Sequence, residues 1–329
     1  EQASSALMAM ALHELGIKAV SLTGGQAGII TENTAGKARI LKIDAKRLRD
    51  ELEKGNVVVV AGFQGVTANA SWADITTLGR GGSDTTAVAL AAALKADCCE
   101  IYTDVDGVFT ADPRISLDAQ KLSAISYEEM LEMAGQGARV MHSRAVELAQ
   151  LYGVEILVAN SAKDVPGTLI KKEDPEMEVR NPVTGIAHDI DVTRFTVAAV
   201  PDRPGIASKL FHALAVKNIN VDVIVQNVGA AGHADVSFTV QDADVEKAQK
   251  AIEPVVKEID AGQVVLDQNV AKVSIVGSGI RSNPGYADKM FTALASEGIN
   301  ILSITTSEIR ITCLVERDKI KSAVKALHK

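Results

Sequence analysis

The second half of the chain repeats itself, and this repeat constrains the fold more than any other feature of the sequence. Residues 204–220 match residues 284–300 at a constant shift of 80 positions, with Pro, Gly, Ala, Lys, Phe, Ala, Leu, Ala, Ile and Asn recurring in step. Each copy predicts a strand, a Pro-Gly turn, a helix, an Ile-Asn turn, two strands and a helix. This order is typical of a βαββαβ ferredoxin-like unit. We therefore expect two such units, at residues 195–268 and 269–329.

The first 170 residues alternate between short apolar runs and helical patterns. The expected strands include residues 57–61 and 100–103, and the expected helices include residues 84–96, 127–135 and 137–150. This alternation predicts an α/β sandwich with a largely parallel sheet, in which the fully apolar run 57–61 takes an inner position. Charged residues and two prolines then mark a linker, at residues 171–194.

Composition and charge exclude several classes of function. Hydrophobic residues make up 47% of the 329 residues and aromatic residues only 3%, so we expect a core of Ala, Val, Leu and Ile. The formal net charge is −8 with no basic stripe, which argues against nucleic acid, and no apolar run is long enough to span a membrane. Cys98, Cys99 and Cys313 form no CxxC pair, so we expect a reducing cytoplasmic location. We expect no metal-ligand cluster.

A glycine-rich stretch at residues 76–87, Thr-Thr-Leu-Gly-Arg-Gly-Gly-Ser-Asp-Thr-Thr-Ala, joins a strand-like run to an alanine-rich helix. A strand, a glycine-rich turn and a helix form an arrangement that holds small anionic ligands. The glycines let backbone N–H groups approach a ligand, and Arg80 offers a planar fork to a carboxylate or phosphate. The alternative is a plain turn with Asp84 as the helix N-cap. That alternative does not explain an arginine among three glycines.

Together with Ile-Tyr-Thr-Asp-Val-Asp-Gly-Val-Phe-Thr-Ala-Asp-Pro-Arg at residues 101–114, this stretch resembles the aspartate kinase family. The resemblance covers nearly the whole chain, and its motifs are long and specific. It implies an amino-acid kinase-like α/β/α sandwich over residues 1–170, followed by two regulatory ACT units at the repeat.

The resemblance also implies an activity. The family transfers the γ-phosphoryl group of ATP, bound with Mg²⁺, to the β-carboxylate of L-aspartate, giving 4-phospho-L-aspartate for lysine, threonine and methionine synthesis. The acceptor carboxylate has a reference pKa of about 3.9, so no general base is needed. One alternative is a non-catalytic, amino-acid-sensing regulatory subunit, which the retention of residues 76–114 argues against. Another is a different amino-acid kinase such as glutamate kinase, which the tandem ACT units argue against.

The beginning of the chain departs from the family pattern. Glu1 leads directly into an apolar helical run, whereas the family's first strand carries a Lys-x-x-Gly-Gly-type phosphate loop. We therefore expect the catalytic domain to be incomplete at its N-terminus, and the chain as printed to have little activity by itself.

By resemblance, the aspartate site consists of Arg80, Gly81, Gly82, Ser83, Asp84, Glu1 and Phe63. Arg80 is expected to clamp the α-carboxylate and Asp84 to take the α-ammonium group, while Phe63 walls the pocket. Glu1 matches an acidic residue of the family, with a solvated chain end as the alternative.

By the same resemblance, the nucleotide residues are Thr103, Asp104, Phe109, Thr110, Asp112, Arg114 and Arg139. Phe109 would lie by the adenine or ribose, and Arg114 would reach the phosphates. Arg139 stands where the family has a lysine, and His142 nearby is expected to be a structural hydrogen-bonding residue.

The ACT units are expected to bind threonine, lysine or both as effectors, and to pair into a homodimer or higher oligomer. The expected effector residues are Asp202, Gly205, Ile206, Ala207, Asn220, Val221, Asp222, Gln226, Tyr286, Ala287, Asn300, Ile301, Ser307 and Glu308. The helix N-terminus after Pro204-Gly205 suits a carboxylate. The alternative is that Pro-Gly only starts a helix and Ile-Asn is only a turn.

Overall fold

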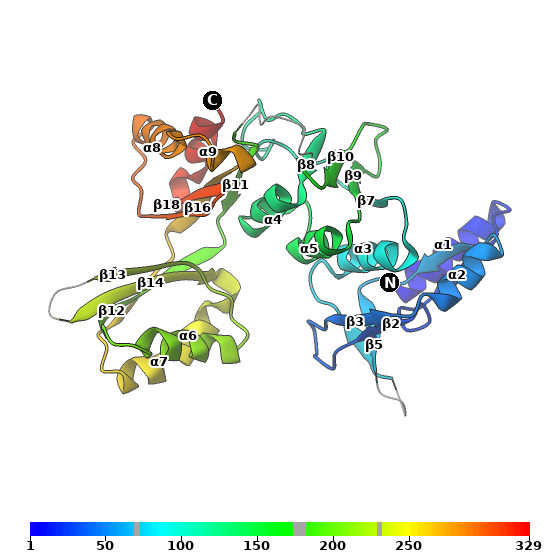
Figure 1. Cartoon of the computed structure of the whole chain (residues 1–329), viewed down its shortest axis with the longest axis horizontal. Coiled ribbons are helices and arrows are strands. Elements are labelled where there is room, and N and C mark those ends of the chain that lie inside the picture. Colours follow the sequence, from blue (N-terminus) through cyan, green and yellow to red (C-terminus); the bar gives the residue numbers. More distant parts are fainter. Residues whose placement is uncertain (69–72, 174–181, 229–231) are drawn as a thin grey trace. The chain divides into compact units, whose positions relative to one another are not determined.

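The computed structural model describes residues 1–68, 73–173, 182–228 and 232–329 (Figure 1). Of these described residues, a first compact unit contains 1–68, 73–109, 120–135 and 139–173, and a second contains 110–119, 136–138, 182–228 and 232–329. Residues 174–181 of the predicted linker lie outside the described residues. Two short segments that precede the linker thus belong to the second unit, which the sequence did not indicate.

The first unit combines helices and short strands. Its helices are α1 (Gln2–Glu14), α2 (Lys46–Glu53), α3 (Gly82–Leu94), α4 (Tyr127–Gly135) and α5 (Ser143–Tyr152). Its strands are β1 (Ala19–Leu22), β2 (Ile29–Thr31), β3 (Ile40–Ile43), β4 (Val57–Val60), β5 (Gln64–Thr67), β6 (Ile75–Thr77), β7 (Cys99–Thr103), β8 (Ala124–Ser126), β9 (Ile156–Asn160) and β10 (Thr168–Lys171).

Parallel pairing predominates in this unit, as predicted. Among the described strands, β1–β4, β2–β5, β7–β9 and β8–β10 pair in parallel, whereas β2–β3, β5–β6 and β9–β10 pair antiparallel. Part of the core consists of Leu22, Ile29 and Leu48, each at most 2% exposed. The predicted α/β class of the N-terminal part is confirmed.

Two local expectations for this unit are wrong. Among the described residues β4 pairs only with β1, and Val57 is 43% exposed, so an apolar run did not imply an inner position. The helix expected from residue 137 begins at Ser143. Gly137 has φ of +104°, a conformation that a right-handed helix does not contain.

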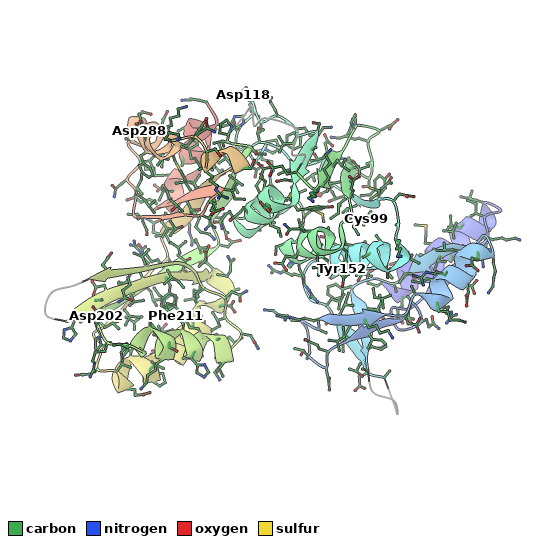
Figure 2. All side chains as sticks on the ribbon, viewed as in Figure 1. Cys99, Asp118, Tyr152, Asp202, Phe211 and Asp288 are labelled. Atoms are coloured by element: carbon green, nitrogen blue, oxygen red, sulfur yellow. The ribbon has the colours of Figure 1, made fainter. Side chains whose placement is uncertain are left out.

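The first repeat folds as predicted into a βαββαβ unit. It contains β12 (Val192–Pro201), α6 (Ile206–Val216), β13 (Asp222–Val228), β14 (His233–Gln241), α7 (Val245–Glu258) and β15 (Val264–Asp267). The strands form an antiparallel sheet of order β13-β14-β12-β15. Phe195 stacks on Phe238 with ring centroids 5.4 Å apart. Phe211 of α6, which Figure 2 labels, meets Phe238 edge-on at 5.5 Å. These aromatic contacts join the helix layer to the sheet.

The second repeat completes its sheet with a strand from another part of the chain. It contains β16 (Val270–Val276), α8 (Tyr286–Ser296), β17 (Ser303–Thr306), β18 (Arg310–Glu316) and α9 (Ile320–His328). Its sheet has the order β11-β16-β18-β17, where β11 (Gly185–Asp189) takes the place that β15 has in the first repeat. The predicted linker 171–194 thus contains a strand of the second repeat, and the first repeat is inserted between β11 and β16.

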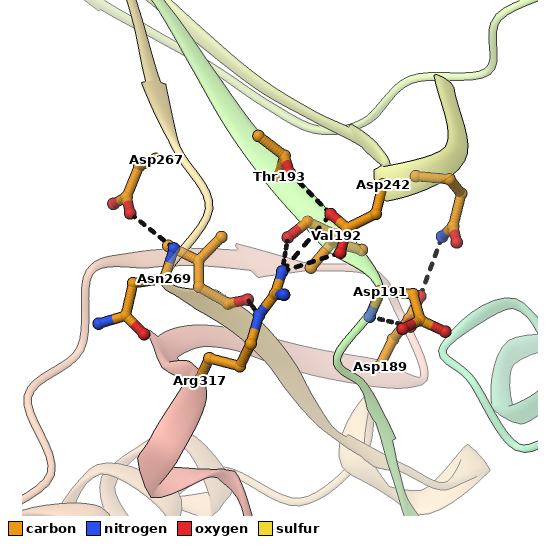
Figure 3. Close-up of polar contacts among 10 residues, drawn as sticks. Asp189, Asp191, Val192, Thr193, Asp242, Asp267, Asn269 and Arg317 are labelled. Atoms are coloured by element: carbon orange, nitrogen blue, oxygen red, sulfur yellow. Dashed lines mark hydrogen bonds and ion pairs between the residues drawn. The ribbon is translucent and has the colours of Figure 1, made fainter. Parts of the chain in front are cut away.

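This insertion makes the chain cross between the repeats twice, and Arg317 contacts both crossings (Figure 3). Its Nη2 donates to the carbonyl of Val192 at 2.8 Å, and its Nε donates to the carbonyl of Val270 at 3.2 Å. The same guanidinium pairs with Asp242 of the first repeat at 3.1 Å. Thr193 donates to Asp242 at 2.7 Å. One side chain of the second repeat therefore holds the junction of the two repeats.

The two short segments that precede the linker pack against the second repeat. Ala111 is only 3% exposed and lies in the hydrophobic core of that repeat, with Ile115 and Ala119 packed beside it. Ile186 of β11 donates its backbone N–H to the carbonyl of Thr110 at 2.7 Å. Residues 110–119 thereby pack with the second repeat, although residues 110–114 belong to the motif at 101–114 in sequence.

Candidate active site and effector site

The glycine-rich turn between β6 and α3 has a left-handed backbone at two positions. Gly79 has φ of +82° and Gly81 φ of +63°, values that favour glycine. The N–H of Gly82 donates to the carbonyl of Gly79 at 3.0 Å, which closes the turn and starts α3. Arg80 and Ser83 are exposed at this turn. The predicted order of strand, glycine-rich turn and helix is therefore formed, and anion binding at this turn stays a prediction.

Phe63 lies directly against this turn. It is a non-glycine residue with φ of +68°, and its N–H donates to Thr86 of α3 at 3.1 Å. Its carbonyl accepts from the N–H of Leu78 at 2.9 Å. A Cβ added at Gly82 would come within 2.8 Å of its ring. Backbone strain of this kind persists only where neighbours enforce it, and it clusters at functional sites.

Two residues that the sequence did not single out for this site support the turn from the other side. The side chain of His142 packs closely against the turn, so a Cβ added at Gly81 would lie 2.2 Å from the Cβ of His142. Arg144 donates from Nη1 to the carbonyl of Leu78 at 2.9 Å and from Nη2 to the carbonyl of Ala38 at 2.8 Å. His142 was expected to be structural, but no sequence signal pointed to Arg144.

Asp84 lies in the first turn of α3 and is half-buried. Burial raises the pKa of its carboxyl above the ordinary value, and a backbone N–H of His142 offsets part of that rise. A cation placed beside Asp84 would favour the ionised form further. This environment is compatible with the ammonium-binding role expected for it.

The first turn of α1 reaches the same region. Gln2 donates from Nε2 to Gln64 at 2.7 Å, and Gln64 directly follows Phe63. Glu1, the residue before Gln2, is exposed. The fold thus brings the beginning of the chain close to a residue of the predicted aspartate pocket.

Part of the predicted nucleotide segment lies where the parallel strands β7 and β9 end together. Thr103 ends β7, and its side chain donates to Asp104 at 3.1 Å. In the loop that follows, Asp106 accepts from Asn160, at the end of β9, at 2.6 Å and from Lys163 at 3.0 Å. Ligands commonly bind at the carboxyl ends of parallel strands. Asn160 and Lys163 were not among the predicted residues, because neither carries a motif.

The rest of the predicted nucleotide set is divided between the two units. Phe109 belongs to the first unit, where it forms a β-bridge with Lys121. Thr110, Asp112 and Arg114 belong to the second unit. Arg139 belongs to the first unit and is exposed in a turn after α4.

Asp112 and Arg114 form a tight turn of their own. Arg114 donates from Nε and Nη2 to the two carboxylate oxygens of Asp112, at 3.0 Å and 2.9 Å. The Arg114 guanidinium holds the pKa of Asp112 below its ordinary value. The Arg114 side chain remains 88% exposed, so it can reach a solvent-borne anion.

The first repeat brings some of its predicted effector residues together. Gln226 of β13 donates to Asp202 at 3.5 Å, and Asp202 is exposed just after β12 (Figure 2). Gly205 has φ of +92° and precedes Ile206 at the start of α6. Exposed residues at this end of the repeat also include Ala207 and Asn220, with Val221 half-buried.

Asp222 has a structural partner as well. It forms an ion pair with Lys272 of β16 at 2.8 Å, and the Lys272 side chain is only 3% exposed. Burial by itself raises the pKa of Asp222, but the charge and hydrogen bond of Lys272 outweigh burial and hold that pKa below its ordinary value. This pair joins the first repeat to the second.

The predicted residues of the second repeat lie on separate elements. Tyr286 begins α8, and the ammonium group of Lys289 lies 4.6 Å from its ring centroid. Ala287 is half-buried beside it, Asn300 is exposed, and Ile301 is half-buried. Ser307 donates its N–H to the carbonyl of Arg310, and Glu308 pairs with Arg281 at 2.8 Å. These contacts all lie within the second repeat.

Membrane-spanning helices and metal sites are the other features to consider in the described residues. None of the described helices has both the length and the apolar composition to cross a bilayer. In the same part of the chain, no three His, Cys, Asp or Glu residues lie close enough together to form a metal site.

Comparison with known proteins finds relatives over the whole chain. Residues 1–160 match the amino acid kinase family, and residues 198–254 and 273–329 match the ACT domain. An aspartate kinase of Pseudomonas putida is 51% identical over 100% of this chain and 79% of its own length. The aspartokinase of Mycolicibacterium smegmatis is 48% identical over 100% of this chain and 78% of its own length.

Solved structures agree with these relatives. Escherichia coli aspartokinase III in complex with aspartate and ADP has a TM-score of 0.82 and 26% identity, over 99% of this chain and 72% of that one. The same enzyme in complex with lysine and aspartate has a TM-score of 0.74 over the same shares of the two chains. The match of residues 1–160 to a kinase family favours an enzyme over a regulatory subunit without a kinase domain.

The close packing of His142 on the turn predicts that Gly81→Ala is strongly destabilising. The new Cβ would overlap His142 and would also require a left-handed alanine. We expect a loss of about 2–5 kcal/mol in the free energy of unfolding of the first unit, measured by denaturant unfolding. Gly55→Ala is the matched control, since Gly55 has φ of +76° but no atom within 4 Å of an added Cβ. Equal losses in both variants would contradict the steric role of His142.

The Asp222–Lys272 pair predicts a pH-dependent effect of Asp222→Asn. The variant leaves Lys272 without its partner, and we expect a loss of about 2 kcal/mol at pH 7, below the value for fully buried pairs because the Asp222 side chain is 41% exposed. The folded pKa of Asp222 is lower than its unfolded pKa. Its contribution is therefore present above about pH 4 and is lost as the pH falls through the folded pKa.

The measurement is the difference in thermal midpoint between wild type and variant across this pH range. That difference should be large at pH 7 and small near the folded pKa of Asp222. The control is Asp318→Asn, which changes an exposed aspartate of the second repeat. A difference that stays constant with pH would show that the ion pair is not its cause.

Proposed function

Because the chain belongs to the aspartate kinase family and is an ACT-containing kinase, we propose that the turn at residues 78–84 is its aspartate site. The observation that carries this proposal is the support of the turn on both sides, by Phe63 and by His142 with Arg144. This support leaves Arg80 and Ser83 exposed on a rigid backbone. Rigid, preorganised donors are what phosphoryl transfer to an ionised acceptor requires.

In this proposal each polar group of aspartate has a partner of opposite charge or dipole. Arg80 pairs with the α-carboxylate through its planar fork, and Asp84 takes the α-ammonium group. Backbone N–H groups at Gly81 and at Ser83 in the first turn of α3 face developing negative charge. The β-carboxylate attacks the γ-phosphorus as an anion, so the residues orient it and neutralise charge without removing a proton.

We propose that Mg²⁺–ATP, as the second substrate, uses Thr103, Asp104, Phe109, Thr110, Asp112, Arg114 and Arg139. Support comes from the loops after β7 and β9, which meet at the carboxyl ends of parallel strands, and from the exposed side chain of Arg114. The Escherichia coli neighbour was solved with ADP and aspartate. The positively charged Arg114 and Arg139 would neutralise phosphate charge, and Mg²⁺ would enter with the nucleotide.

For regulation, we propose that threonine or lysine binds the first repeat at Asp202, Gly205, Ala207 and Gln226. The N-terminus of α6 would receive the effector's carboxylate, and the Asp202–Gln226 pair would read its ammonium group. A lysine complex is known for the Escherichia coli neighbour. We also propose pairing of ACT units into a homodimer or higher oligomer, and a cytoplasmic location, which fits free Cys98, Cys99 and Cys313.

The proposed aspartate clamp predicts a selective effect of Arg80→Lys. We expect the KM for aspartate to rise about 10- to 100-fold, because a bidentate charged contact is lost while the charge remains. The KM for ATP should change less than about twofold. The measurement is steady-state formation of aspartyl phosphate, trapped as the hydroxamate, in the enzyme expressed from its whole gene.

Arg47→Lys is the matched control, since Arg47 is exposed on α2 away from the turn. Unchanged aspartate kinetics in Arg80→Lys would rule out the clamp. Absence of ATP-dependent aspartyl phosphate in the wild-type enzyme would overturn the proposed reaction itself.

The effector proposal predicts ligand-dependent stability of the second unit. Threonine or lysine at 100 times its Kd should stabilise the chain by about 2.7 kcal/mol, seen as a rise in thermal midpoint. Asp202→Ala should remove this rise, whereas Asp288→Ala, which changes an exposed aspartate of the second repeat, should keep it. Methionine serves as the amino-acid control. A shift that survives Asp202→Ala would place the effector elsewhere.

A further inference from the structure

His328, the last residue of α9, lies against the segment that leads through the predicted nucleotide residues. Its Nε2 is 2.8 Å from the hydroxyl of Thr110, and its Nδ1 is 3.3 Å from the hydroxyl of Ser116. Neither His328 nor Ser116 belongs to the aspartate, nucleotide or effector residues predicted from the sequence. The two hydroxyls lie at opposite ends of a seven-residue segment, 110–116, and one imidazole ring joins them.

The imidazole ring of His328 can form hydrogen bonds to both hydroxyls at the same time. A neutral imidazole has one N–H donor and one acceptor nitrogen, and a hydroxyl can serve as either. Both contacts can therefore form at once, whichever nitrogen carries the proton. An aliphatic side chain could fill the same space, but it could hold neither hydroxyl.

The segment between the two hydroxyls is closed by its own hydrogen bonds. The N–H groups of Ile115 and Ser116 both donate to the carbonyl of Asp112 at 2.9 Å, and the N–H of Arg114 donates to the Asp112 carboxylate at 2.9 Å. Ala111 anchors the segment in the core of the second repeat. His328 thus holds both ends of a compact turn whose outer face carries the exposed Arg114 guanidinium.

We propose that His328 is a positioning residue for the nucleotide, which sets residues 110–116 so that Thr110, Asp112 and Arg114 meet the phosphates in one conformation. This inference rests on the proposed function, since the nucleotide role of these residues belongs to it. It adds that the second repeat orders the segment that carries Thr110, Asp112 and Arg114 of the predicted nucleotide set. The helix that carries His328 lies in a regulatory repeat, so ordering of the nucleotide segment depends on the folded state of that repeat.

A first experiment tests whether His328 orders residues 110–116, and it does not depend on enzyme activity. Hydrogen–deuterium exchange of the chain should show amides 114–116 exchanging about tenfold faster in His328→Ala than in wild type. The N–H of Thr85, which donates to the carbonyl of Gly81 in the first unit, should be unaffected. Lys325→Ala, an exposed change on the same helix, is the matched control and should leave amides 114–116 as in wild type.

Conservative variants separate the two contacts. A glutamine amide reaches about as far as Nε2 and an asparagine amide about as far as Nδ1. We therefore expect His328→Gln to keep the Thr110 contact and His328→Asn to keep the Ser116 contact. Both should exchange more slowly than His328→Ala, with glutamine nearer to wild type because the Thr110 contact is the shorter one.

A second experiment tests the link to the nucleotide in the enzyme expressed from its whole gene. His328→Ala should raise the KM for ATP about tenfold and leave the KM for aspartate within about twofold, with His328→Gln restoring most of the loss. Unchanged exchange at amides 114–116 would overturn the positioning role. Faster exchange with unchanged ATP kinetics would show that the segment does not serve the nucleotide. Faster exchange in a protein without aspartate kinase activity would instead overturn the proposed function on which the nucleotide link rests.

Discussion

The site depends on one steric constraint: the backbone at Gly81 must pass within van der Waals contact of His142. A Cβ at this position would lie 2.2 Å from the His142 Cβ, so only glycine allows the turn and α5 to approach so closely. Beside this contact, Arg80 and Ser83 remain exposed at the turn. Arg144 also holds the turn, because it donates hydrogen bonds to the backbone carbonyls of Leu78 and Ala38. A bulkier residue at Gly81 would separate α5 from α3 and remove the support of the exposed groups.

The second unit has an analogous constraint in the edge of a sheet. Without a second neighbour beside it, β16 would leave the backbone groups of one edge unpaired. In the first repeat the corresponding place is filled by β15, but the second repeat ends with α9 and takes β11 instead. This choice inserts one repeat into the other and creates the two crossings that Arg317 holds. It also brings β11 next to Thr110, whose carbonyl accepts from Ile186.

The chain between β7 and β8 belongs partly to each unit. Residues 103–109 fold with the first unit, and residues 110–119 fold with the second. The predicted nucleotide motif is therefore shared between a kinase-like fold and a regulatory repeat. An effector that changes the stability of the repeat has a covalent and packed route to the motif, through Ala111 in the core and through His328. Under the proposed function, this route would give coupling between the effector and nucleotide sites a physical basis, because both sites would act on the order of one segment.

Local sequence patterns by themselves determined the class of fold, the βαββαβ order of the first repeat, the βαββα part of the second and the glycine-rich turn. Helical periodicity, Pro-Gly turns and glycines at left-handed positions act within a few residues, so they can be read without the rest of the chain. The family motifs at residues 76–87 and 101–114 likewise pointed to aspartate kinase.

Only the tertiary structure decided which distant residues complete these local elements. Residues far apart in sequence come together at three places. These are the pairing of β11 with β16, the two hydrogen bonds of Arg144, and the position of His328 between Thr110 and Ser116. The residues concerned carry no motif, and their side chains would suit a solvated surface equally well. Their partners are set by how sheets and helices pack, which a local pattern does not encode. For the same reason the helix expected from residue 137 begins only at Ser143, after a left-handed glycine that lies against the backbone of His188.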